Sequence, residues 1–164
     1  MSETPAADLV TMVVEIPKAS RNKDEMDATT GEIFLDRMLF TATRYPAEYG
    51  YIPDTLAEDG DTLDAMALTS EPTFPGCRIR IRPIGLFLME DQGRPDHKVL
   101  GVPAGEPVWG GVHNLDEVPG HLLAEMEHFF SVYKDLEETK TATLGWRGVD
   151  EAIAVIAAAR RASG

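Results

Sequence analysis

The sequence predicts a mainly β protein, a barrel or a sandwich, followed by two helices at its C-terminus. Short segments rich in β-branched and apolar residues recur about every ten residues, and turn signals separate them. Beyond residue 118 the apolar residues recur instead at the three- and four-residue intervals of an amphipathic helix. Many short strands of this kind are typical of barrels and sandwiches.

The length of the chain favours one domain. It has 164 residues, 43% of them hydrophobic, which is enough for a core in one compact unit. The opening residues are polar and include a proline, so we expect 1–8 to be a flexible tail and 9–164 to form the single domain.

Five segments are expected to be strands. The first is rich in β-branched residues, and each of the others follows a turn signal: ATTG, EDGD, FPGC or DQGRPD. In chain order the expected strands are 10–16, 32–39, 62–68, 78–89 and 97–103.

Two helices are expected near the C-terminus. Residues 119–138 carry one apolar face, made by Leu122, Met126, Phe129, Tyr133 and Leu136. Residues 150–162 begin with acids and end with two arginines, which matches the helix dipole. The segment 104–118 has Gly and Pro and no period, so we expect a long surface loop.

Composition excludes several kinds of protein. The net charge of −13 and the pI near 4.6 argue against a nucleic-acid or anionic-membrane surface. The single cysteine, Cys77, cannot form an intramolecular disulfide. We find no signal peptide, and the longest apolar run, 152–159, is too short to span a bilayer. A cytoplasmic protein is expected.

The stretch EDGDTLDAM gathers three aspartates around one glycine. Asp59-Gly60 alone indicates a turn and needs no other role. Asp64 is different, because it lies in an expected strand whose two faces are both apolar. A carboxylate there is costly to bury unless a positive group meets it.

Further acids stand beside lone cations. Asp91 and Asp96 bracket a turn, and Lys98 begins the next strand. Taken alone, this acidic turn is an ordinary solvated hairpin tip. Lys23, Glu25 and Asp27 are two residues apart in an extended segment, so their side chains point to one side of it. Glu15 stands at the end of an otherwise apolar strand. Clusters of acids next to cations suggest hard metal ions and an anionic substrate.

The cations and phenols have ordinary roles when each is taken alone. Tyr133 is expected in the core and Lys134 on the surface, while Arg37 stands among apolar residues. Together with Tyr45 and Tyr49 they form an inventory suited to phosphate oxygens. The four histidines show no metal-ligand spacing and no nucleophile motif is present, so covalent catalysis has no support.

These residues lie in motifs that resemble the family I soluble inorganic pyrophosphatases. The aspartate signature is EDGDTLDA, and the likeness covers nearly the whole chain through VVEIPKASRNKDEMD, LDRMLFTATRYPAEYGYIPDTL, FPGCRIRIRPIGLFLMEDQGRPDHKVLGVP and HFFSVYKDLE. The resemblance implies an α+β, mainly β fold: a five-stranded OB-like barrel with flanking strands and two C-terminal helices. It also implies Mg²⁺-dependent hydrolysis of pyrophosphate to two phosphates.

The resemblance implies roles for the acids. Asp61 resembles the general base, which takes a proton from a metal-bridging water. By this likeness, the ligands of a tight pair of metal ions are Asp59, Asp64 and Asp96. The ions that arrive with the substrate are held, by the same likeness, by Asp91, Asp96, Glu15 and Glu25. Several Mg²⁺ ions are expected, with Mn²⁺ or Zn²⁺ as substitutes.

The resemblance also implies the phosphate binders. They are Lys23, Arg37, Tyr45, Lys98, Tyr133 and Lys134, with Tyr49 and Lys140 as supporting positions. Among them, Arg37, Tyr133 and Lys134 are expected to stabilise charge on the departing phosphate.

Three positions depart from the family pattern. Thr62 stands where Pro or Glu is usual, which removes a φ restraint worth about 0.4–1 kcal/mol. Asp24 replaces an aromatic residue and Glu48 an asparagine, so two extra negative charges are expected beside the site.

Two other functions remain open. A metal-dependent phosphohydrolase acting on longer polyphosphates or nucleotides would use similar binding residues. A noncatalytic OB-type module for single-stranded nucleic acid would need a basic groove with exposed aromatic residues. This chain is acidic and only 7% aromatic, so it offers little of either. The bacterial type that the chain resembles is usually a homohexamer, and the helix around His128 is an expected contact.

Overall fold

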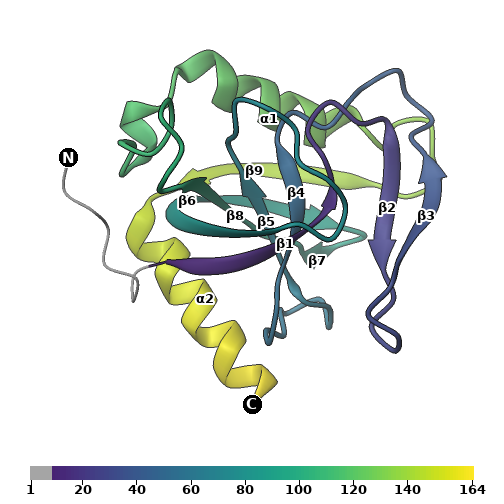
Figure 1. Cartoon of the computed structure of the whole chain (residues 1–164). Coiled ribbons are helices and arrows are strands. Elements are labelled where there is room, and N and C mark those ends of the chain that lie inside the picture. Colours follow the sequence, from purple (N-terminus) through teal and green to yellow (C-terminus); the bar gives the residue numbers. More distant parts are fainter. Residues whose placement is uncertain (1–8) are drawn as a thin grey trace.

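The computed structural model describes residues 9–164 (Figure 1). The expected tail, 1–8, therefore lies outside the described residues, and the division into a tail and one domain stays a prediction. None of the helices in the described part is long and apolar enough to cross a membrane.

A closed ring of five strands forms the centre of the molecule. The strands pair in the order β1 (Val10–Ile16), β4 (Glu48–Ile52), β5 (Leu63–Ala67), β8 (Lys98–Pro103) and β6 (Arg78–Asp91). A further pairing of β1 with β6 closes the ring. All of these pairings are antiparallel except the one between β5 and β8. Four of the five expected strands are the ring strands β1, β5, β6 and β8, and the fifth, 32–39, lies outside the ring. The expected OB-like barrel is confirmed.

Four further strands flank the ring. Both β7 (Arg94–Pro95) and β9 (Thr141–Arg147) pair with β6. A separate two-stranded sheet is formed by β2 (Asn22–Met26) and β3 (Ile33–Met38). We call this sheet the β2–β3 ribbon, and Figure 1 shows it standing beside the barrel. The five expected strands did not include β2, β4, β7 or β9, although the segment around Lys23 and Glu25 was expected to be extended.

The two C-terminal helices cover different parts of the barrel (Figure 1). Helix α1 (Gly120–Val132) buries Phe129 and Phe130 in one apolar cluster, together with Met66 of β5. Helix α2 (Val149–Ser163) buries Ile156 in a second cluster, together with Ala65 of β5. Neighbouring residues of β5 thus enter different clusters, so this strand is apolar on both faces, as expected.

The first expected helix, 119–138, is too long by six residues at its end. Helix α1 ends at Val132, and η2 (Leu115–Glu117) is a short 3-10 turn within the expected loop. After Tyr133 the chain makes i to i−3 turn bonds, from Asp135 N to Val132 O and from Glu137 N to Lys134 O. Leu136, the last residue of the apolar pattern, is 69% exposed.

The register of β1 on β4 requires a glycine at position 50, which pairs with Val14. A Cβ there would lie 1.8 Å from Val13 O, which is a backbone atom and cannot easily move. We expect Gly50→Ala to lower the free energy of unfolding by about 1–3 kcal/mol or more. Urea titration of both proteins would measure it.

The matched control for this prediction is Gly105→Ala. A Cβ at position 105 meets nothing within 4 Å, so this variant should unfold like the wild type. Equal midpoints for Gly50→Ala and wild type would contradict the close approach of β1 and β4.

Candidate functional site

A pocket of about 380 Å³ opens where the barrel, the β2–β3 ribbon and the end of α1 meet. Its described lining includes eight acids, which come from β1, β2, the 53–62 loop, β5, β6 and the turn before β8. They are Glu15, Asp24, Glu25, Asp59, Asp61, Asp64, Asp91 and Asp96. Only two lysines, Lys23 and Lys134, line the same pocket. We therefore expect cations to occupy this pocket.

The structure brings most of the expected site residues to this pocket. Every expected metal ligand lines it, as do Asp61, Lys23, Tyr49, Tyr133 and Lys134. Arg37, Tyr45 and Lys98 do not. Tyr45 is buried, with its ring 5.2 Å from that of Tyr49, so it supports a pocket residue from behind.

The loop that carries Asp59 and Asp61 is closed at its base by Thr55. The Thr55 hydroxyl donates to Ile52 O, and it accepts from Leu63 N at 3.0 Å. At the tip, Gly60 has a φ of 89°, a conformation that favours glycine. The turn expected at Gly60 is confirmed.

The two aspartates of this loop differ in their surroundings. Asp59 accepts a hydrogen bond from Asp61 N at 3.0 Å, whereas the Asp61 side chain is exposed. Burial, followed by the charges of Asp96 and Asp61, raises the pKa of Asp59 against that hydrogen bond. Asp61 is thus the more accessible carboxylate.

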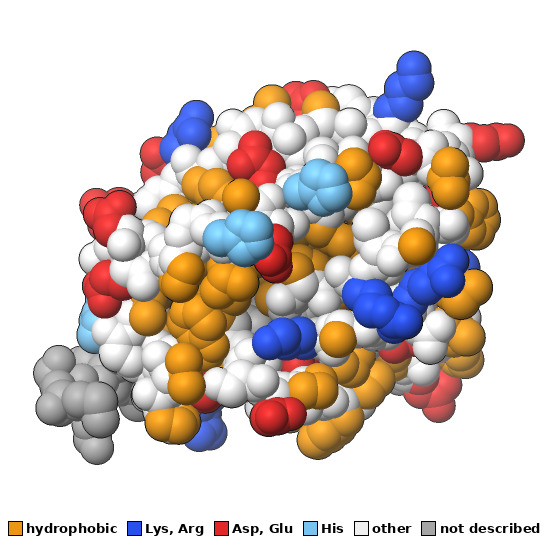
Figure 2. Space-filling model, turned by 90° about the horizontal axis from the view of Figure 1, so that it is seen from above, with side chains coloured by type: hydrophobic (Ala, Val, Ile, Leu, Met, Phe, Trp, Pro, Cys, Tyr) orange, Lys and Arg blue, Asp and Glu red, His pale blue; other side chains and the backbone are white. Residues whose placement is uncertain are grey.

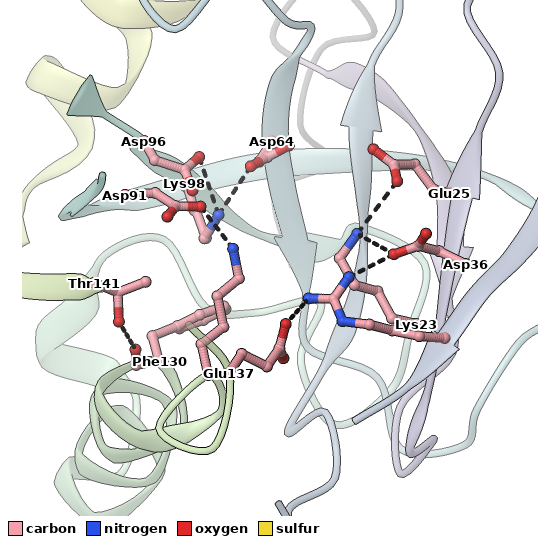
Figure 3. Close-up of polar contacts among 12 residues, drawn as sticks. Lys23, Glu25, Asp36, Asp64, Asp91, Asp96, Lys98, Phe130, Glu137 and Thr141 are labelled. Carbon is pink, nitrogen blue, oxygen red and sulfur yellow. Dashed lines mark hydrogen bonds and ion pairs between the residues drawn. The ribbon is translucent and has the colours of Figure 1, made fainter. Parts of the chain in front are cut away.

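Lys98 lies buried between two carboxylates of the pocket (Figure 3). Its side chain is 0% exposed, and Nζ donates to Asp64 Oδ2 at 2.8 Å, to Asp96 Oδ1 at 3.2 Å and to Tyr49 Oη at 2.8 Å. An ammonium has three donors, so all of them are used. Lys98 stands directly opposite Asp64 in the parallel register of β5 and β8.

The charges in this group act against one another. Burial raises the pKa of Asp64 to about 7, with Lys98 lowering it and the nearby Asp96 raising it again. Burial would raise the pKa of Asp96 too, but Lys98 and Lys134 lower it below the ordinary value. Burial would lower the pKa of Lys98, yet Asp64 and Asp96 raise it. Lys98 is therefore charged at neutral pH, and Asp96 is ionised more readily than Asp64.

A second ion pair lies at the end of α1. Lys134 Nζ is 2.6 Å from Asp91 Oδ2, and Asp91 Oδ1 is buried with no hydrogen-bond partner among the described residues. Glu15, whose pKa burial raises, accepts from Met26 N at 2.8 Å and so ties β1 to β2. Buried carboxylate oxygens with spare lone pairs are suitable ligands for a cation.

The donor set fits a hard divalent ion such as Mg²⁺. All of the acids in the pocket offer oxygen, which Mg²⁺ prefers, and the lining contains no histidine or cysteine. Within 9–164, no three side chains of Asp, Glu, His or Cys are grouped so as to ligate one ion together. The ammonium groups of Lys98 and Lys134 lie against these carboxylates instead.

A third set of charges runs along the ribbon (Figure 3). Lys23 lies 3.4 Å from Glu25 and 3.8 Å from Asp36, and Asp36 also contacts Arg37. Arg37 in turn lies 2.6 Å from Glu137. Sequence reasoning missed Asp36, although it adjoins Arg37, and Glu137, which ends the motif HFFSVYKDLE but has no local pattern that predicts its contact with Arg37.

The two expected extra charges have different places. Asp24 lines the pocket, as expected. Glu48 does not, because it is 0% exposed and accepts from Thr73 N at 2.8 Å and from Thr73 Oγ1 at 2.7 Å. Its carboxylate anchors a loop, so it adds no charge to the pocket wall. Lys140 is exposed and also lies outside the lining.

Comparisons with known proteins agree on one family. The family model described as inorganic pyrophosphatase matches residues 12–163. The inorganic pyrophosphatase of Methanosarcina acetivorans is 48% identical over 149 residues, covering 91% of this chain and 89% of that protein. The solved structure of inorganic pyrophosphatase from Thermus thermophilus matches with a TM-score of 0.92 and 39% identity, covering 99% of this chain and 96% of that one. A structure from Coxiella burnetii matches with a TM-score of 0.93 and 34% identity over the full length of both chains.

Proposed function

Because this chain belongs to the inorganic pyrophosphatase family, it is an enzyme that hydrolyses pyrophosphate to two phosphates, and we propose that it does so in the pocket described above. The observation that supports this place is the lining of eight acids and two lysines. Pyrophosphate and the acids repel each other, so the pocket needs cations before it can hold the substrate.

We propose Mg²⁺ as the cation, with Mn²⁺ or Zn²⁺ as substitutes. Asp59, Asp64 and Asp96 would hold one pair of ions, and Asp91, Asp96, Glu15 and Glu25 those that accompany the substrate. When bound, Mg²⁺ ions neutralise the acids and the substrate and lower the pKa of water that they bind. The oxygen-only donor set supports this choice of metal.

Asp61 is proposed as the general base. It stands on the loop fixed by Thr55, and its side chain is exposed toward the pocket that it lines. No side-chain hydrogen bond occupies its carboxylate among the described residues, so it is free to accept a proton from the attacking water. The water attacks one phosphorus, the bond to the bridging oxygen breaks, and the leaving phosphate keeps that bond's electron pair.

The cations and phenols of the site are proposed to hold the phosphates. Lys23, Lys134 and Tyr133 line the pocket and can reach a ligand directly. Arg37 stands beside Lys23 through their shared contact with Asp36. Lys98 first holds Asp64 and Asp96 together, so it can turn to a phosphate oxygen only after cations have replaced it at these acids.

A direct assay tests the function. Purified protein with pyrophosphate and Mg²⁺ should release phosphate, and no release with Mg²⁺, Mn²⁺ or Zn²⁺ would refute the proposal. Tripolyphosphate and ATP assayed in parallel would measure any broader range. Salt-sensitive binding to oligonucleotides would instead favour the nucleic-acid module, which the acidic pocket opposes.

Metal affinity should depend on pH through Asp64. Its carboxyl must lose a proton to bind a cation, and its pKa is raised to about 7, so affinity is full above this value and is lost as pH falls through it. We expect the affinity for Mg²⁺ to rise about tenfold from pH 6 to pH 8.

Calorimetric titration with Mg²⁺ would test this pH dependence. Repeating it in buffers of different ionisation enthalpy counts the protons released per ion. An affinity that is equal at pH 6 and pH 8, with no proton released, would contradict the raised pKa of Asp64.

We further propose a cytoplasmic homohexamer, on the resemblance to the bacterial type. Figure 2 looks onto the side that carries α1, where hydrophobic side chains reach the surface among scattered charges. On β3, Phe34, Leu35 and Met38 are also more than half exposed, as expected for surfaces that another subunit covers. Light scattering should give about six times the 18.0 kDa of one chain.

A further inference from the structure

The β2–β3 ribbon pairs only with itself among the described strands, so side-chain contacts must fix its place beside the pocket. One ion pair joins it to the segment after α1: Arg37 Nη2 on β3 lies 2.6 Å from Glu137 Oε1. Glu137 follows Lys134 by three residues, and Lys134 lines the pocket. Glu137 therefore links two cations that the proposed function assigns to phosphate.

The contact with Glu137 is the more protected of the two that Arg37 makes. The Glu137 side chain is 11% exposed, whereas Asp36, the other partner of Arg37, is 41% exposed. Water screens an exposed ion pair and leaves its geometry loose, but it screens a nearly buried pair much less. Glu137 is thus the stronger constraint on the position of the guanidinium.

Arg37 keeps donors for a ligand despite both contacts. A guanidinium has five N–H groups, and the contacts with Asp36 and Glu137 each engage a different terminal nitrogen. Its Nε is buried and has no hydrogen-bond partner within 9–164, and the same is true of Glu137 Oε2. The group is therefore held on two sides without being saturated.

We propose that Glu137 is a positioning residue, which holds the guanidinium of Arg37 beside Lys134 so that both cations meet the same substrate. Its charge has a second effect, because a carboxylate beside the guanidinium weakens the attraction of Arg37 for an anion and so favours release of phosphate. The inference rests on the proposed function. A misplaced binding group can cost about 10²-fold in rate, so the position of Arg37 matters.

Two substitutions separate the position of Arg37 from the charge beside it. Glu137→Gln keeps an oxygen acceptor and removes the charge, whereas Glu137→Ala removes both. For Glu137→Ala we expect kcat to fall about 10–100-fold and amide hydrogens of 33–38 to exchange faster, because β3 loses its ion pair with the segment after α1 while Glu15 still holds β2. For Glu137→Gln we expect wild-type exchange and kcat within about threefold of wild type. Calorimetry should show inorganic phosphate binding about 2–5-fold more tightly to Glu137→Gln, the range of a weak ion pair.

Glu138→Ala is the matched control. Glu138 is the next residue, is exposed and makes no side-chain hydrogen bond or ion pair within the described part of the chain, so this variant removes one charge and leaves the Arg37–Glu137 pair in place. It should match wild type in exchange and kcat. Unchanged exchange of 33–38 in Glu137→Ala, or equal kcat losses in Glu137→Ala and Glu137→Gln, would overturn the positioning role.

The test also separates this inference from the proposed function. Amide exchange and phosphate binding do not require turnover. If the wild type releases no phosphate from pyrophosphate, the proposed function fails, while faster exchange confined to Glu137→Ala would still support the link to the ribbon. If Glu138→Ala tightens phosphate binding as much as Glu137→Gln, the proposed effect of the Glu137 charge is refuted.

Discussion

Replacing Asp61 with asparagine should lower kcat about 10²–10⁴-fold while metal binding is kept. The side chain is exposed, lines the pocket and accepts no side-chain hydrogen bond within 9–164, so asparagine fits the same space. An amide cannot accept the proton that the attacking water must lose. Phosphate release and calorimetric titration with Mg²⁺, run on the same preparation, measure both effects.

The control for Asp61→Asn is Glu58→Gln. Glu58 lies on the same loop and is exposed, but it does not line the carboxylate pocket, so loss of its charge should change kcat little. Normal turnover by Asp61→Asn would refute its role as the base. A large loss of Mg²⁺ affinity would instead indicate that Asp61 holds metal.

Lys98→Met should strongly destabilise the metal-free protein. The side chain is 0% exposed and its ammonium is the cation that contacts both Asp64 and Asp96. Removing one partner of a buried ion pair costs about 3–5 kcal/mol, because the remaining charges lose their compensation. We expect a loss of this size in the free energy of unfolding at pH 8, measured by urea titration in the presence of a chelator.

Two conditions should reduce that loss. The pKa of Asp64 is raised to about 7, so at pH 6 most of this carboxyl is protonated and carries no charge to leave uncompensated. Added Mg²⁺ should also restore stability, and by more than it adds to wild type. Lys140→Met, which changes an exposed lysine, should leave unfolding unaltered. A Lys98→Met protein as stable as wild type at pH 8 without metal would contradict the counter-ion role.

The strand pattern by itself predicted a barrel or a sandwich, and the family resemblance implied the OB-like barrel. The expected strand 62–68 became β5, Leu63–Ala67, since a segment with apolar residues on both faces has few alternatives to the inside of a sheet. Strand β4 carries a buried acid, Glu48, and a glycine, Gly50, both of which are uncommon in strands. Its place depends on close contact with β1, which no local pattern reveals.

The end of α1 shows a different limit. Leu136 continues the apolar spacing of the helix, yet it is exposed, because the chain turns after Tyr133 and then forms β9 along β6. Tertiary pairing thus overrides a local helical pattern. The same turn carries Glu137 toward the ribbon, and a contact between residues so far apart in the sequence has no local signature.

The acids were easier to predict, because each stands in a place where a charge is costly or conspicuous. Asp64 in an apolar strand was the strongest signal, and the structure places it against Lys98. The local pattern gave no sign that Lys98 has all three donors engaged within the protein. That fact follows from the parallel pairing of β5 with β8, which sets Asp64 opposite Lys98, and from the pairing of β4 with β5, which adds Tyr49.

The parallel register that sets Lys98 opposite Asp64 also bears on how faithfully the chain folds. A shift of β8 by one residue along β5 would turn Lys98 to the other face of the sheet and leave Asp64 without its partner. A strand made of valine and leucine alone would tolerate such a shift more easily. The charges that we propose for catalysis therefore also select one alignment of the barrel, so selection for activity would also guard against misfolded forms.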